Sequence, residues 1–165
     1  AQFKYKIDSK KINILLGIGG SGPTKRVPAK IFTDFMRLTT QKYKCKFFLA
    51  TGKDIEEQKI LLEILGSDYK DNCYALDNLS LKEILPIIKS CNISICNDSS
   101  FSHLSSGLGI QTIVLMSDTP LLYGSYSPRM HPIIPDGEST VTHNTLGKLK
   151  INPNKIFEKL NNILD

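Results

Sequence analysis

The sequence has few cysteines and no CxxC pair, which limits the kinds of site it can build. Three of its four cysteines fall inside expected strands or at helix ends, where a free thiol behaves as a small apolar side chain; the four are Cys45, Cys73, Cys91 and Cys96. We therefore expect reduced core thiols rather than a disulfide framework or a thiolate metal site, which favours a cytoplasmic location.

Long apolar runs are also absent. The longest such segment, residues 12–18, has the length of a buried strand and falls far short of a bilayer span. The sequence shows no secretory signal peptide, that is, no charged and then apolar leader with a small-residue cleavage site, so it gives no indication of export. The chain begins at Ala1 rather than Met, and we expect it to be a domain excised from a longer protein.

Composition is that of an ordinary globular domain, with 41% hydrophobic and 22% charged residues in a chain of 165. This length is enough to bury one core. The net charge of +5 comes with no basic helix and no interleaved aromatic stripe, so we expect no nucleic-acid partner. Mild attraction to phosphate ligands or to an anionic membrane surface, hence peripheral membrane association, is compatible with this charge.

The period of the apolar residues switches repeatedly between strand-like runs and helical spacing. Expected strands cover residues 12–16, 47–50, 73–76, 93–96, 112–116 and 133–134, and expected helices lie around 31–38, 55–65, 80–90, 99–108 and 152–164. Ser80 and Glu83 form a capping box, and Pro86 should kink or shorten the helix that follows. The pattern predicts one α/β domain over residues 1–165, a Rossmann-like parallel sheet with helices on both faces.

In such a sheet, ligands bind beyond the carboxyl ends of the strands, so the residues after each strand decide function. Residues 17–22 follow the first strand and match GxGxxG. The dinucleotide fingerprint requires a helix at the third glycine and an acidic residue about 20 positions further on. Pro23 and Pro28 delay the helix, and the expected acidic residue is missing.

Walker A fails as well, because Lys25 is not adjacent to Gly22. What remains is a glycine turn, Gly20, Ser21 and Gly22, whose exposed amides approach an anion beside Lys25 and Arg26. A plain glycine turn without a ligand is the alternative.

The loop after residues 93–96 contains Asp98, Ser99, Ser100 and His103. Hydroxyl residues at a helix start present free amides and side-chain donors, which favours a phosphate site. The alternative is structural, with Asp98 capping the helix and His103 satisfied at an interface.

Two further loops carry polar candidates. Glu56 or Glu57 would accept a ribose hydroxyl after the second strand, although a carboxylate in a first helical turn is also favoured by the helix dipole alone. Thr119, in a turn after residues 112–116, would lend its hydroxyl to a phosphate. No His, Cys, Asp or Glu set has metal-ligand spacing, and no serine lies in a GxSxG elbow, so neither a metal site nor a hydrolytic triad is expected.

Taken in order, these motifs resemble the C-terminal half of glycosyltransferase family 9, the ADP-heptose–lipopolysaccharide heptosyltransferases. The family's glycine turn with Lys-x-Trp-Pro is similar to residues 20–28, and its Gly followed by Glu is similar to Gly52 with Glu56 or Glu57. Its Asp-Ser/Thr-Gly-x-x-His-Leu motif is similar to residues 98–104, and its Phe-Gly-Pro-Thr turn to residues 116–119. The sequence departs from these patterns at Val27, Ser100 and residues 117–118, where Trp, Gly and Gly-Pro are usual.

The resemblance implies the C-terminal, donor-binding domain of a two-domain GT-B glycosyltransferase of bacterial lipopolysaccharide synthesis. Such an enzyme inverts the anomeric carbon, requires no metal or other cofactor and uses a nucleotide-sugar donor similar to ADP-heptose. The implied acceptor is a glycolipid or saccharide, bound with the general base on a missing N-terminal domain. The implied location is the cytoplasm, including the cytoplasmic face of the inner membrane.

The resemblance also implies roles for single residues. Lys25 and Asp98 are the candidate catalytic residues, and Lys25 would stabilise the departing diphosphate together with the amides of residues 20–22 and the helix start at Ser99 and Ser100. His103 would orient Asp98 or a phosphate oxygen. Two other functions remain open: a stand-alone nucleotide-binding module without catalysis, and an NAD(P)-dependent dehydrogenase domain.

Overall fold

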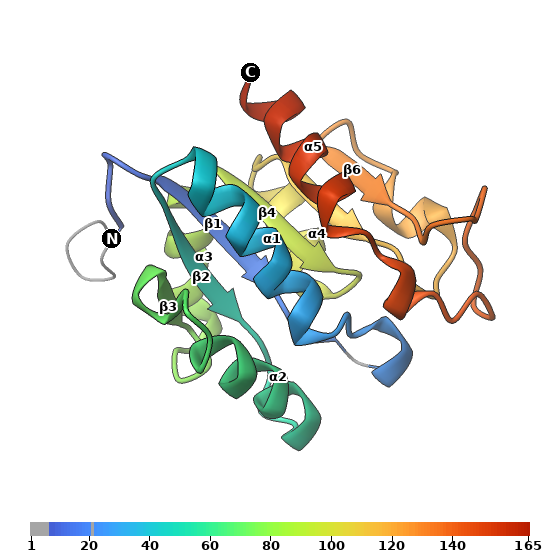
Figure 1. Ribbon diagram of the computed structural model, residues 1–165, viewed down its shortest axis with the longest axis horizontal. Coiled ribbons are helices and arrows are strands. Elements are labelled where there is room, and N and C mark those ends of the chain that lie inside the picture. The colour runs from blue at the N-terminus through green and yellow to red at the C-terminus, as the bar shows by residue number, and fades with distance from the viewer. Residues whose placement is uncertain (1–6, 21) are drawn as a thin grey trace.

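A six-stranded parallel sheet forms the middle layer of the computed structural model, which describes residues 7–20 and 22–165 (Figure 1). Its strands, in the order β3-β2-β1-β4-β5-β6, are β1 (Ile12–Gly17), β2 (Cys45–Ala50), β3 (Cys73–Ala75), β4 (Ile93–Asn97), β5 (Thr112–Leu115) and β6 (Met130–Ile133). Every neighbouring pair is parallel. The predicted Rossmann-like α/β fold is therefore confirmed.

Five α-helices cover the two faces of this sheet: α1 (Ala29–Lys42), α2 (Ile55–Leu65), α3 (Leu81–Ser90), α4 (Ser100–Gly107) and α5 (Pro153–Leu164). Successive strand residues point to opposite faces, so Ile14 and Leu16 pack under α1, α2 and α5 while Leu15 packs under α3 and α4 (Figure 1). All three side chains are fully buried. This two-sided burial explains why the strands appear in the sequence as unbroken apolar runs.

Most predicted elements lie within a few residues of their expected positions. The capping box of Ser80 and Glu83 is present at the start of α3, and Pro86 lies inside that ten-residue helix. The expected strand at 133–134 was misplaced, since β6 ends at Ile133. The position of β6 was not evident from the sequence because Pro132 interrupts the apolar run. An edge strand tolerates a proline, whereas a central strand does not.

All four cysteines are free. Burial raises the pKa of Cys73, Cys91 and Cys96 to about 12 and that of Cys45 to about 11. These thiols are consequently poor nucleophiles and act as packing groups. Within the described residues, every helix is too short or too polar to pass through a bilayer.

Close approach of two central strands at the sheet edge requires a glycine. Gly17 ends β1 and is in register with Cys96 of β4. A Cβ atom at position 17 would lie 2.7 Å from Cys96 Sγ and 2.8 Å from its Cβ. The loop that leaves β1 therefore starts from a point where no larger residue fits.

We expect Gly17→Ala to lower the free energy of unfolding by about 1–3 kcal/mol, the usual cost of overpacking a core. The matched control is Gly107→Ala at the end of α4, where an added Cβ meets nothing within 4 Å. That change should leave stability unchanged or raise it by about 0.5–1 kcal/mol. Urea unfolding measures both, and equal midpoints for the two variants would contradict the packing argument.

Candidate functional site

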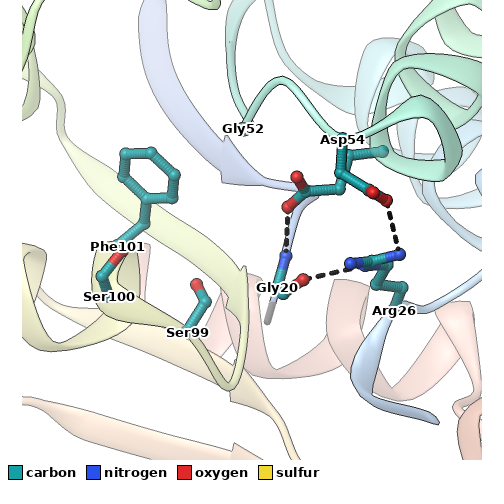
Figure 2. Close-up of a pocket in the computed structure, with 8 residues that line it drawn as sticks. Gly20, Arg26, Gly52, Asp54, Ser99, Ser100 and Phe101 are labelled. Carbon is teal, nitrogen blue, oxygen red and sulfur yellow. Dashed lines mark hydrogen bonds and ion pairs between the residues drawn. The ribbon is translucent and has the colours of Figure 1, made fainter. Parts of the chain in front are cut away.

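Two adjoining cavities lie at the carboxyl edge of the sheet. The first, of about 680 Å³, is drawn in Figure 2 and is lined by Gly20, Arg26, Gly52, Asp54, Glu57, Ser99, Ser100 and Phe101. The second, of about 320 Å³, is lined by Lys25, Asp98, Ser99, Ser100, His103, Thr119, Tyr123 and His143. Because Ser99 and Ser100 line both, the start of α4 forms their common wall.

The buried side chain of Asn97 fixes the loop that follows β1. Its Nδ2 donates to the carbonyl oxygens of Ile18 (3.1 Å) and Gly19 (3.2 Å), and its Oδ1 accepts from the amide of Val27 at 3.4 Å. Asn97 is fully buried at the end of β4. One side chain thus holds both ends of the glycine loop against the neighbouring strand.

The Gly20 peptide is bonded on both sides. Its N–H donates to Glu57 Oε1 at 2.8 Å, and its carbonyl oxygen accepts from Arg26 Nε at 2.8 Å (Figure 2). Arg26 also pairs with Asp54, with 3.0 Å between Nη1 and Oδ2. The expectation that the Gly20 amide is free to approach an anion is therefore wrong, because the Glu57 carboxylate already occupies it.

The other two residues of the expected glycine turn contribute less to the described site. Gly22 precedes the 3₁₀ turn η1 (Pro23–Lys25) and lines neither cavity. Ser21 lies outside the described residues. Helix α1 begins only at Ala29, so the GxGxxG match opens no helix and the dehydrogenase alternative lacks its structural basis.

The structure distinguishes the two neighbouring glutamates of α2. Glu57 is 8% exposed, and its carboxylate lies where side chains at Gly19 and Gly52 would otherwise stand. Glu56 points outward: its side chain is 62% exposed and pairs with Lys59 at 3.0 Å. Glu57 lines the first cavity and Glu56 lines neither of the two, so only Glu57 remains a candidate for ligand contact.

Asp98 is the acidic centre of the second cavity. Its Oδ2 accepts from Thr119 Oγ1 at 2.7 Å and lies 3.9 Å from Lys25 Nζ, while its Oδ1 lies 3.8 Å from His103 Nε2. The alternative that Asp98 caps α4 is wrong, because Ser99 occupies the N-cap and the carboxylate faces Thr119 instead. The fold thus gathers three sequence-predicted residues, Lys25, His103 and Thr119, around the buried carboxylate of Asp98.

The start of α4 supplies polar groups to both cavities. The Ser99 side chain is directed toward the first cavity (Figure 2), with its hydroxyl oxygen buried and without a hydrogen-bond partner in the described structure. Ser100 is exposed on the common wall. The amides of a first helical turn, together with the helix dipole, favour a bound anion. A phosphate group placed here would lie between Lys25 on one side and the glycine loop on the other.

Four lining residues were not predicted from the sequence: Asp54, Phe101, Tyr123 and His143. Phe101 stands next to the predicted serines, and its position in the first turn of α4 could have identified it. Tyr123 and His143 come from the segment 121–147, which has no hydrophobic period. No signal in the sequence indicates where that segment lies.

The family model of glycosyltransferase family 9 (heptosyltransferase) matches residues 1–150. The chain belongs to this family. Within the described residues, no group of three or more His, Cys, Asp or Glu side chains is arranged to hold a metal ion.

The chain is similar to lipopolysaccharide heptosyltransferase 1 of Campylobacter coli, with 28% identity over 148 residues that make up 88% of this chain and 43% of the relative. Among solved structures, E. coli ADP-heptose lps heptosyltransferase II superimposes with a TM-score of 0.78 at 20% identity, covering 99% of this chain and 49% of that one. The chain spans about half the length of these relatives.

The E. coli heptosyltransferase WaaC shares the fold in two structures. The one with ADP gives a TM-score of 0.76 at 14% identity and covers 98% of this chain and 47% of that one. The one with ADP-2-deoxy-2-fluoro heptose gives 0.73 at 11% identity, with 94% and 44% covered. These likenesses confirm the fold class predicted from the sequence, one half of a GT-B glycosyltransferase.

We expect Asn97→Ala to lower the free energy of unfolding by about 2–4 kcal/mol, because it leaves the buried carbonyls of Ile18 and Gly19 without a donor. The control is Asn78→Ala, which removes an exposed side chain bonded only to Lys53 in the described structure. Its effect should stay within about 0.5 kcal/mol. Thermal and urea unfolding test the pair, and a similar small loss in both would show that Asn97 does not hold the loop.

Proposed function

We propose that this chain is the donor-binding half of a two-domain glycosyltransferase that uses a nucleotide diphosphate sugar similar to ADP-heptose. The observation that carries the proposal is the pair of cavities sharing the start of α4, with the buried carboxylate of Glu57 in one and the ammonium of Lys25 beside the other. Membership of glycosyltransferase family 9 supports it. So does the fold shared with WaaC, whose structures contain ADP and an ADP-sugar.

The two cavities suit different parts of such a donor. The first has the volume of a typical small-molecule site and offers Glu57 as an acceptor for ribose hydroxyls. The second is smaller and places Lys25, His103 and Thr119 around Asp98. We assign the nucleoside to the first cavity, the sugar to the second, and the diphosphate to the wall of Ser99 and Ser100 between them.

Transfer by this site would proceed through direct displacement with inversion. The bond between the anomeric carbon and the phosphate oxygen breaks while the acceptor oxygen attacks, and the acceptor proton passes to a base on the other half of the enzyme. Negative charge grows on the diphosphate, so donors placed beforehand stabilise the transition state more than the ground state. Lys25 and the amides of α4 are those donors, and they serve without a metal ion.

Asp98 has a supporting part in this mechanism. Its carboxylate faces both Lys25 and His103, so it holds two potential cations at the rim of the diphosphate position. The acceptor is a glycolipid or saccharide bound by the other half. We place the reaction in the cytoplasm, at the inner membrane surface, where the net charge of +5 favours association with anionic lipids.

The chain should bind ADP in calorimetry more tightly than UDP or GDP, without turning over an ADP-sugar. Lys25→Ala should weaken ADP binding about 10- to 100-fold, as expected for a charge-assisted contact, and Ser99→Ala about three- to tenfold. The control is Lys30→Ala, which removes an exposed ammonium paired with Asp34 on α1. In the intact enzyme, loss of Lys25 should raise the barrier by about 3 kcal/mol. Unchanged affinity in both Lys25→Ala and Ser99→Ala would remove the basis of the proposal.

Glu57→Gln should weaken ADP binding about fivefold, because a neutral amide oxygen accepts a ribose hydroxyl less strongly than a carboxylate. The side-chain oxygen of the introduced glutamine can still accept from the Gly20 amide, so the loop stays in place. Glu56→Gln, one residue away and outside both cavities, should leave affinity unchanged. A larger loss in Glu56→Gln than in Glu57→Gln would refute the assignment.

A further inference from the structure

Tyr126 makes a direct contact with His103 that none of the sequence motifs includes. The Tyr126 hydroxyl lies 2.6 Å from His103 Nδ1. The two rings are also stacked, with their centroids 5.6 Å apart and their planes 13° from parallel. A side chain that stacks on a ring and bonds to one of its nitrogens leaves that ring little freedom to rotate.

The turn that precedes Tyr126 packs on the sheet through Gly124. The 3₁₀ turn η3 (Leu121–Gly124) places Gly124 against Met116 and Val114, where an added Cβ would collide with the Met116 side chain. Ser125 Oγ then donates to the carbonyl oxygen of Leu121 at 2.8 Å. Tyr126 is 54% exposed, yet its backbone follows directly on a turn that the buried Gly124 fixes against the sheet.

The surroundings of His103 determine which of its nitrogens carries the proton. Nε2 lies 3.8 Å from Asp98 Oδ1, and a carboxylate only accepts hydrogen bonds. A lone pair on Nε2 would face that negative charge, so the N–H is favoured at Nε2. Nδ1 of the neutral ring is then an acceptor, and the Tyr126 hydroxyl donates to it.

We propose that Tyr126 is a positioning residue that holds His103 in the tautomer with its N–H at Nε2, directed into the second cavity. This inference rests on the proposed function. Nε2 lies 3.8 Å from Asp98, too far for a hydrogen bond, so its N–H is left to donate to the donor diphosphate at the rim between the second cavity and the wall of Ser99 and Ser100. Lys25 supplies charge to the same anion, and His103 supplies a directed hydrogen bond. Tyr126 acts only through His103.

The test combines nitrogen NMR of the histidine rings with ADP calorimetry on the 165-residue chain. In alkaline buffer, the unchanged chain should show His103 with its proton on Nε2 alone. Tyr126→Phe should give a mixture of both tautomers and bind ADP about three- to tenfold more weakly. The control is Tyr43→Phe, which removes a hydroxyl bonded to Asn161, far from both cavities in the fold; neither measurement should change.

A double-mutant cycle separates positioning from a general structural effect. In the His103→Ala background, Tyr126→Phe should leave ADP affinity unchanged, because no ring remains to be oriented. A further loss in that background would overturn the role of Tyr126. So would retained Nε2 protonation, or unaltered ADP affinity, in the single variant Tyr126→Phe.

The same measurements distinguish this inference from the function on which it rests. If the unchanged chain fails to bind ADP, the proposed function is overturned, and the diphosphate contact of His103 with it. If ADP affinity depends on Lys25 but the His103 tautomer does not change in Tyr126→Phe, only the role of Tyr126 is overturned. Gly124→Ala, which displaces the turn, provides a second variant with the same expected change of tautomer.

Discussion

The buried amide of Asn97 is the interaction on which the rest of the site depends. It bonds to carbonyls on one side of the glycine loop and to an amide on the other, so three elements meet at one side chain. The loop then presents Gly20 to Glu57 and Arg26, and the chain entering α1 brings Lys25 toward Asp98. A buried amide that satisfies several backbone groups is costly to replace, because each group left unpaired keeps its full desolvation penalty.

Much of the fold could be predicted because strands buried on both faces leave long apolar runs that contrast with the period of the helices. The edge of the sheet that carries the site could also be predicted, because parallel strands bring their carboxyl ends together. The choice between Glu56 and Glu57 could not, because it depends on the rotation of α2 about its axis, which no single motif fixes. Tyr123, Tyr126 and His143 could not be placed either, since tertiary contacts such as Gly124 against Met116 position their segment. That segment has no period of its own.

The second cavity holds opposite charges that lie near one another without forming tight ion pairs. One carboxylate faces an ammonium at 3.9 Å and an imidazole at 3.8 Å, distances longer than those of tight hydrogen-bonded ion pairs. Thr119 makes a short contact to Asp98, at 2.7 Å. The carboxylate is therefore anchored by a hydroxyl, while the Lys25 ammonium remains able to turn toward a more negative partner and the His103 ring is held in place by Tyr126. Such an arrangement suits a ligand whose charge changes during a reaction, because the protein groups need to move very little.

Glu57 has a second consequence for the first cavity. The Gly20 amide occupies one lone-pair site of a carboxylate that offers about four. An incoming hydroxyl can therefore share this carboxylate instead of displacing the loop, which Glu57 and Arg26 already hold in place. Little conformational entropy remains to be lost on association, so a larger part of the contact energy is retained as affinity.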